Sequence, residues 1–170
     1  MFGKQSLGKK LKLQAESLGA CEEGLSGLEQ LNEHELINRY LHFIEFAIDK
    51  DWPSNEFIKK NFDKALLEHN NIYVDSEIER RNARQIVVVQ GKSHGVLLYD
   101  GFTTADVYIR HNSEVTIDCS RLSKVFISVY DNAKVRVIQR DGASVYVYKH
   151  GESCEIKAEG DVMQRTYKSE

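Results

Sequence analysis

The chain has little cysteine, and its cysteines are scattered. Its 170 residues include three cysteines, Cys21, Cys119 and Cys154, and none of them belongs to a CxxC pair. An odd number of isolated cysteines excludes a disulfide framework and a cysteine-rich zinc site in practice. It also favours a reducing compartment, so we expect a cytoplasmic protein, or a virion-associated one if the chain is encoded by a phage.

Long apolar runs and a charge excess are missing as well. No window reaches the roughly 18 apolar residues that a membrane span needs. The start, Met1-Phe2-Gly3-Lys4, lacks the apolar core of a secretory signal. With 23 Lys and Arg against 26 Asp and Glu, the formal net charge is -3. A nucleic-acid binder would carry a basic excess, so the sequence argues against nucleic acid and against a membrane as partners.

What is present divides the chain into two parts. Hydrophobic residues make up 41% and charged residues 29%, which is typical of a folded domain. Apolar residues recur with helical spacing in residues 1–71, whereas β-branched residues gather in residues 72–170. We therefore predict an α+β protein with a helical N-terminal segment followed by a β-repeat domain.

Three helices are expected in the first part. The first runs from about Ser6 to Gln30, although Gly19, Gly24 and Gly27 interrupt it. The second begins at Asn32, which with Glu35 resembles a capping box, and ends near Asp51. The third runs from about Asn55 to Glu68. After them we predict a short strand at 72–75, a charged loop at 77–84, and strands as far as about residue 162.

A repeat of ten residues organises the second part. The pattern small-x-Val-x-Val/Ile recurs, and the small residue falls at Ala105, Ser113, Ser123, Ala133, Ala143 and Ser153. The first spacing is 8 and the others are 10, and in the degenerate last repeat Cys154 and Ile156 replace the two valines. Period-two alternation sends the valines and isoleucines to one face of each strand. Asn, Asp and Gly before each strand supply a tight turn and tolerate left-handed dihedral angles.

Two architectures satisfy this repeat. In a β-solenoid, successive units stack because one unit alone cannot bury its apolar face. In an antiparallel β-meander or sandwich, each Asp-Asn or Asp-Gly pair would close a hairpin. The same pattern repeats without mirror-like alternation, which favours the solenoid, a single-stranded β-helix.

The repeat also predicts which side chains point outward. Tyr108, Phe126 and Tyr146 carry aromatic rings, and Arg136 carries a charge. If one coil takes 20 residues, Phe126 and Tyr146 stack on one face with Tyr108 nearby, while Thr116 and Arg136 stack on the other. These four residues, Tyr108, Phe126, Tyr146 and Arg136, are the candidate binding residues. The alternative is that the rings only stack on one another and cover the strands.

Catalytic and metal-binding signals are weak. The six histidines show no H-E-x-x-H spacing, and His111 and His150 lie at expected turns without an evident third ligand. Cys119 lies near Asp118 and His111, but a nucleophile pair requires proximity in space. The Gly91–Gly95 segment lacks phosphate-loop spacing and is interpreted as a β-turn. We therefore predict no catalytic residue, no metal and no cofactor.

Two stretches carry a resemblance. The segments 43–54 and 99–113, with Trp52-Pro53-Ser54 and His111-Asn112-Ser113, resemble a family of proteins from gut bacteria and their phages. The resemblance covers most of the chain from about residue 30. That family has no assigned activity, so it implies no catalytic residue. The repeats are more distantly similar to the single-stranded β-helix modules of adhesins and bactofilins, from which this chain departs in its few repeat glycines and its helical start.

These patterns predict a non-enzymatic structural or protein-interaction module, associated with a phage or mobile element. A protein partner or self-association is expected because the ends of a solenoid carry unpaired strand edges. The alternative is a carbohydrate-binding module that uses the exposed aromatic face.

Overall fold

A computed structural model describes residues 6–168, and the described chain divides into two compact units between Asn70 and Asn71. The first four residues, on which the expectation about a secretory signal depends, lie outside the described part. Each unit is considered by itself.

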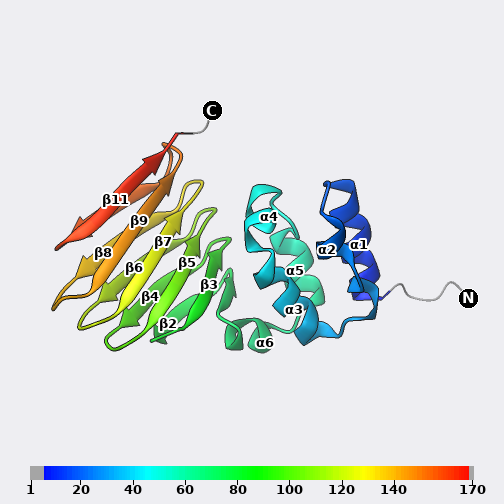
Figure 1. The fold of residues 1–170 in the computed structure, drawn as a ribbon, viewed down its shortest axis with the longest axis horizontal. Helices are drawn as coiled ribbons and strands as arrows, with labels where there is room; N and C mark the ends of the chain where they lie inside the picture. The colour runs from blue at the N-terminus through cyan, green and yellow to red at the C-terminus, as the bar shows by residue number, and fades with distance from the viewer. Residues whose placement is uncertain (1–5, 169–170) are drawn as a thin grey trace, which may run out of the picture. The chain divides into compact units, whose positions relative to one another are not determined.

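Short helices form the first unit (Figure 1). They are α1 (Leu7–Ser17), α2 (Glu22–Leu25), a 3-10 turn (Leu28–Gln30), α3 (Glu33–His42), α4 (Ile44–Asp49), α5 (Asn55–Asn61) and α6 (Lys64–His69). The predicted single helix from Ser6 to Gln30 is therefore wrong. Gly19 and Gly27 take positive φ angles of 80° and 70°, which end one helical segment and start the next.

The second and third predicted helices begin as expected but are also divided. Asn32 and Glu35 form a complete capping box at the start of α3. Phe43 then leaves helical geometry between α3 and α4. Asp63, whose carboxylate accepts the Leu66 N–H, starts α6 as a separate helix after α5. The shorter helices share one apolar cluster that contains Leu11, Leu28 and Leu36.

Eleven strands form the second unit within the described residues. They are β1 (Ile72–Val74), β2 (Glu77–Arg81), β3 (Gln85–Gln90), β4 (His94–Tyr99), β5 (Thr104–Ile109), β6 (Glu114–Cys119), β7 (Lys124–Val129), β8 (Lys134–Gln139), β9 (Ser144–His150), β10 (Glu155–Glu159) and β11 (Val162–Tyr167). Odd strands form sheet A in the order β1-β3-β5-β7-β9-β11, and even strands form sheet B in the order β10-β8-β6-β4-β2.

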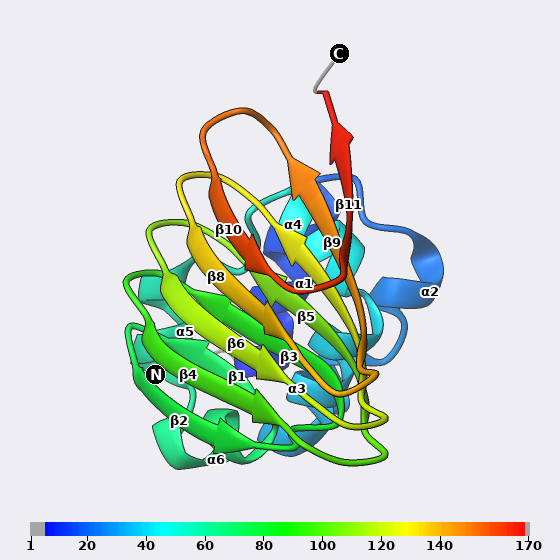
Figure 2. The ribbon, with the colours of Figure 1, turned by 90° about the vertical axis from the view of Figure 1, so that its left-hand side faces the viewer.

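The strands pair in parallel and wind as a β-solenoid with two faces (Figure 2). Each strand pairs with the strand two places away in sequence, as β5 does with β7 and β6 with β8. The solenoid prediction is confirmed, and the antiparallel meander is wrong because consecutive strands lie in different sheets.

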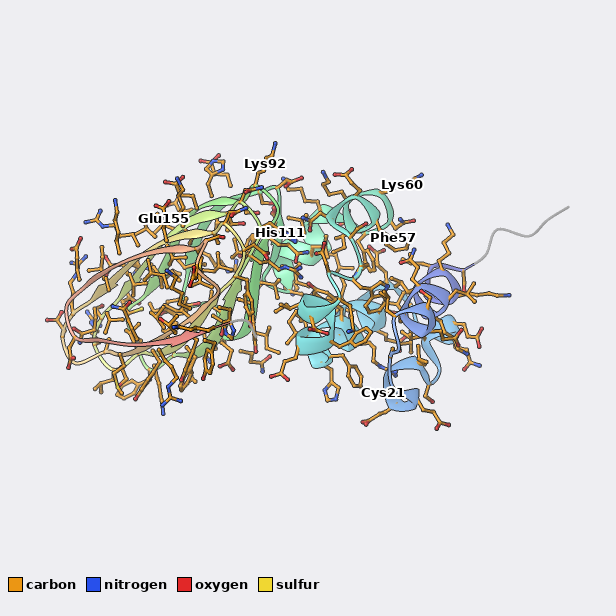
Figure 3. All side chains as sticks on the ribbon, turned by 90° about the horizontal axis from the view of Figure 1, so that it is seen from above. Cys21, Phe57, Lys60, Lys92, His111 and Glu155 are labelled. Carbon is orange, nitrogen blue, oxygen red and sulfur yellow. The ribbon has the colours of Figure 1, made fainter. Side chains whose placement is uncertain are left out.

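One coil takes 20 residues in the regular part of the solenoid. Thr104 aligns with Lys124, and Lys124 aligns with Ser144. Each ten-residue repeat is therefore half a coil. Inward positions stack into columns such as Val107, Ile127 and Val147, which are at most 1% exposed. The inward side chains form one core cluster, and Figure 3 shows side chains filling the space between the two sheets.

The corners show where the repeat alignment was wrong. Thr103, which is buried, occupies the small-residue position of its repeat, whereas Ala105 aligns with Val125 inside strand β5. The small residues then form two regular columns, one at each corner: Ser93, Ser113 and Ala133 before strands of sheet B, and Thr103, Ser123 and Ala143 before strands of sheet A. In the last coil Ile156 aligns with Val135, so buried Cys154, not Ser153, follows Ala133 in the first of these columns.

Polar side chains at one corner join successive coils. The Asp131 carboxylate accepts the His111 backbone N–H (2.9 Å), and His111 Nδ1 accepts the Gly91 N–H (3.0 Å). Both Asp131 and His111 have positive φ angles. The expected tolerance of left-handed geometry is confirmed, but the hydrogen bonds run between coils as well as within a turn.

Two strands were not expected. The charged segment 77–84, predicted as a loop, contains β2, in which only Ile78 is buried. Beyond residue 162, β11 continues sheet A and pairs with β9. Both segments become strands because the neighbouring coil offers a ladder of backbone partners.

A glycine at the start of β4 tests the close approach of two coils. A Cβ atom at Gly95, whose φ is 141°, would lie 2.0 Å from the Ile78 carbonyl oxygen. We predict that Gly95→Ala lowers the unfolding free energy of the solenoid by about 2–4 kcal/mol. Urea unfolding followed by circular dichroism measures it. The control is Gly101→Ala, where no atom lies within 4 Å of the added carbon; equal losses in the two variants would contradict the close approach.

Candidate functional site

The outer face of sheet A carries the aromatic pair that the coil length predicts. Phe126 and Tyr146 align in register, and their rings stack with centroids 5.0 Å apart and planes 14° apart. The Lys124 ammonium lies 5.4 Å from the Phe126 ring centroid. The two rings therefore cover each other, and a cation lies over one of them.

Tyr108 lies on the same face but in another column. It aligns with Ser128, and Asp106 is the residue that aligns with Phe126. The misplacement follows from the repeat alignment, which started this strand at Ala105 instead of Thr103. The structure thus brings together two of the three candidate aromatic residues.

A second aromatic stack lies where sheet A meets one corner. The His150 ring stacks on Tyr130 at 4.3 Å and on Tyr167 at 5.0 Å between centroids. Tyr148 also stacks with Tyr167, at 6.2 Å. The sequence interpretation missed this stack, although Tyr130 and His150 are one coil apart and the period could have revealed them.

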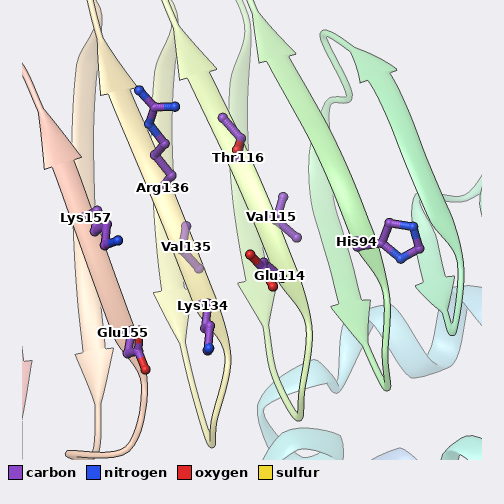
Figure 4. A pocket seen from close by; sticks show the side chains of 9 residues that line it. All are labelled: His94, Glu114, Val115, Thr116, Lys134, Val135, Arg136, Glu155 and Lys157. Carbon is purple, nitrogen blue, oxygen red and sulfur yellow. The ribbon is translucent and has the colours of Figure 1, made fainter.

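Arg136 lies on the outer face of sheet B, where it aligns with Thr116. Its guanidinium donates two hydrogen bonds, of 3.1 and 2.7 Å, to Glu159. It lines a shallow groove over four strands with His94, Glu114, Val115, Thr116, Lys134, Val135, Glu155 and Lys157 (Figure 4). Lys134 lies between Glu114 and Glu155 in register, so the groove is largely charge-compensated.

The candidate nucleophile and its neighbours are not assembled. Cys119 points into the core, where burial raises the pKa of its thiol to about 12. Asp118, the preceding residue, faces outward and pairs with the Arg140 guanidinium. His111 lies before the opposite end of β6 and binds the Gly91 N–H. Their side chains therefore lie on different faces and at different ends of one strand.

Metal-ligating side chains do not gather either. Within residues 6–168, no group of three or more His, Cys, Asp or Glu side chains is placed to hold a metal ion. Gly91–Ser93 form the turn between β3 and β4, as interpreted, and His94 and Gly95 begin β4. There the Asp75 carboxylate accepts the Lys92 N–H at 2.8 Å.

Apolar side chains are exposed at the other corner. Phe102 is 85% exposed and Leu122, one coil later, is 60% exposed. Both precede strands of sheet A, and Gly142 follows them in the next coil. The sequence interpretation did not single out these residues.

The most distinctive surface is the edge formed by the last coil. We call β10 and β11 together the last-coil edge. In the described residues, β10 pairs only with β8 and β11 only with β9, so one side of each strand has no strand partner. Ile156 and Val162 pack on the core but are only partly buried, and Gln164 and Thr166 are exposed at inward positions.

Two hydrogen bonds identify the backbone groups that face the open side of this edge, where no strand is paired. The Glu155 N–H donates to the Ala133 carbonyl, and the Tyr167 carbonyl accepts the Gly151 N–H. Alternate residues of a strand direct their backbone groups to opposite sides. The N–H and C=O groups of Ile156 and Ala158 in β10, and of Gln164 and Thr166 in β11, therefore face the open side, whereas the Val162 N–H donates to the Gly160 carbonyl at 3.2 Å.

Comparisons with known proteins add no relative. No protein-family model, no curated protein and no solved structure matches the chain. Among the described residues, the helices are too short or too polar to cross a membrane.

The Phe126–Tyr146 stack is expected to stabilise the solenoid. In a double-mutant cycle, Phe126→Ala and Tyr146→Ala should show a coupling free energy of about 1 kcal/mol. Urea unfolding of the four proteins measures it. The pair Phe126→Ala and Thr116→Ala, whose residues lie in different sheets, is the control and should be additive. Additivity in both cycles would contradict a stabilising stack.

The corner stack predicts a pH dependence. Burial lowers the pKa of His150 below its ordinary value of 6.5. A lowered folded-state pKa contributes stability that is complete above 6.5 and is lost as the pH falls through the folded value. Between about pH 7.5 and about pH 5, the wild type should therefore lose more unfolding free energy than His150→Phe, which keeps a ring in the stack. Parallel profiles for the two proteins would contradict this assignment.

Proposed function

We propose that the chain is a non-enzymatic structural module that self-associates through the last-coil edge. The observation that carries the proposal is the pair of unpaired strand edges at one end of the solenoid. Backbone groups on such edges form hydrogen bonds readily with another strand. Four residues, Ile156, Ala158, Gln164 and Thr166, direct both their N–H and C=O groups to this side.

The edge lacks most of the features that prevent strand addition. Natural edges are protected by proline, bulges, short strands, charges that point inward or charged side chains on the edge strand itself. The one proline of the chain is Pro53, and β10 and β11 have five and six residues. The charges of these strands, such as Lys157 and Arg165, lie at outward positions that leave the backbone edge accessible.

The polar residues at inward positions favour a backbone-mediated contact. Gln164 and Thr166 follow Val147 and Lys149 in the inward columns of sheet A. They keep the end of the core from presenting a purely apolar surface. Association would then depend on strand hydrogen bonds and register more than on burial of a hydrophobic patch.

The carbohydrate-binding alternative has less support. Sugars stack on the faces of aromatic rings, but Phe126 and Tyr146 cover each other and Tyr108 lies in a separate column. Arg136, the fourth candidate residue, faces the opposite side and is paired with Glu159. Association with a phage or mobile element stays a prediction from the sequence resemblance.

Proline substitutions at the open side test the proposal. The double variant Ala158→Pro with Gln164→Pro removes two N–H donors that face the open side. Both N–H donors point away from the previous coil, so its hydrogen bonds with β10 and β11 are kept. We predict that the wild type self-associates as its concentration rises, whereas this variant stays monomeric with an unchanged circular dichroism spectrum. Light scattering coupled to gel filtration measures both.

The matched control is Ala158→Ser with Gln164→Ser, which keeps both N–H groups and should associate like the wild type. A wild type that is monomeric across the concentration series would contradict the proposal. Equal association of the proline variant and the wild type would also contradict it.

A further inference from the structure

We infer that two copies of the chain join end to end about a two-fold axis. This axis passes between the two Ile156 residues in sheet B and between the two Gln164 residues in sheet A. The inference rests on the proposed self-association and specifies its geometry. Strands related by such an axis run in opposite directions, so β10 pairs antiparallel with β10 of the second copy, and β11 with β11. The contact uses the same surface on both copies and closes after two chains.

The two strands of the edge are matched around their connecting corner. Ile156 lies four residues before Gly160, and Gln164 lies four residues after it. Because residues in both strands rise by about 3.3 Å, these two positions lie at similar distances from the corner. One axis can therefore pass both of them, which allows both sheets to continue into the second copy together.

Backbone geometry fits this register. Ile156 and Gln164 belong to the residues whose N–H and C=O groups face the open side. Directly opposite residues of this kind exchange two hydrogen bonds in an antiparallel ladder. The register pairs residues 154–158 of β10 and its preceding corner with 158–154 of the second copy, and residues 162–166 of β11 with 166–162.

Charge favours this register in sheet B over the one shifted by a single residue. With Ile156 on the axis, Glu155 of each copy lies opposite Lys157 of the other, which places two opposite-charge pairs on the outer face. Shifting the axis to Lys157 would oppose Lys157 to itself and Glu155 to Glu159. Like charges directly opposite destabilise a strand pair, so the shifted register is disfavoured.

The side chains of sheet A are compatible with the same axis. Gln164 of the two copies would face each other, and an amide can both donate and accept a hydrogen bond. Val162 would lie opposite Thr166, and exposed Met163 opposite Arg165. No like-charged pair arises in this sheet, because Arg165 lies off the axis.

Lys157 is available for this pairing. Its neighbour in register, Arg136, is held by Glu159 through two hydrogen bonds. That ion pair leaves Lys157 and Glu155 as the charges of β10 that can interact across the axis.

Symmetric disulfide trapping tests the register. In a Cys21→Ser background, Gln164→Cys places the new thiol opposite its own copy, with Cα atoms about 5.5 Å apart, within disulfide range. Cys119 and Cys154 are buried and stay out of the reaction. We expect most of the Gln164→Cys protein to run as a covalent dimer after mild oxidation on a non-reducing gel.

Thr166→Cys is the matched control. It lies two residues from the axis, so its two copies would be about 14 Å apart, and it should stay monomeric on the same gel. Equal trapping of the two variants, or preferential trapping of Thr166→Cys, would overturn the register.

A charge exchange provides an independent test. Lys157→Glu places two carboxylates opposite each other at both symmetric sites, and we expect it to weaken the dimer by about tenfold or more. Glu155→Lys should weaken it similarly, whereas the double exchange Glu155→Lys with Lys157→Glu should restore association to near the wild-type value. Sedimentation equilibrium measures the dissociation constants.

The outcomes separate this inference from the proposed function. If the proline variant abolishes association but the double exchange does not rescue it, the edge is the interface and the register is wrong. If the proline variant associates like the wild type, the proposed function itself fails.

Discussion

The structure depends on the stacking of inward aliphatic side chains from coils of equal length. No single coil can bury its own Val and Ile residues, because each contributes only a thin layer to the core. With a constant 20-residue advance, each inward side chain lies on the equivalent side chain of the preceding coil, as in the column Val107, Ile127 and Val147. A shift by one residue would turn each of these side chains to the solvent.

The same register determines what the surface presents. Outward residues one coil apart become neighbours, which brings Phe126 onto Tyr146 and Lys134 between two glutamates. At the corner it brings Asp131 to the backbone of His111. The last coil follows the same rule, but no further strand of the described chain covers it. Self-association at that edge is thus a continuation of the interaction that builds the solenoid.

The sequence predicts the architecture where each repeat carries its own signal. Between Ser113 and Val147, small residues and alternating valines recur with period ten, and the solenoid follows from them. The signal fails in β2, where Ile78 alone is buried, and in β11, where Val162 is the one aliphatic inward residue. These strands form because the adjacent coil offers backbone hydrogen-bond partners. No local sequence pattern reveals such partners. Thr103 was missed because Ala105 is the more typical small residue.

The candidate surfaces were predictable to a similar extent. The coil length places Phe126 and Tyr146 together, but the alignment error displaced Tyr108, and the corner stack of Tyr130, His150 and Tyr167 lies outside the repeat core. The open edge could not be located from sequence, because that requires the position of the last strand. In the helical unit, the helices are interrupted at Phe43 and at Asp63. These interruptions depend on packing within that unit, which the spacing of apolar residues does not reveal.

Nuclear Overhauser effects between backbone protons of the solenoid test the central claim most directly. Stacked coils of equal length predict contacts between residues 20 apart, such as Lys124 with Ser144, in the pattern of parallel strands. Contacts that join Ser128 to Val135, as in a hairpin closed at Asp131-Asn132, would contradict it.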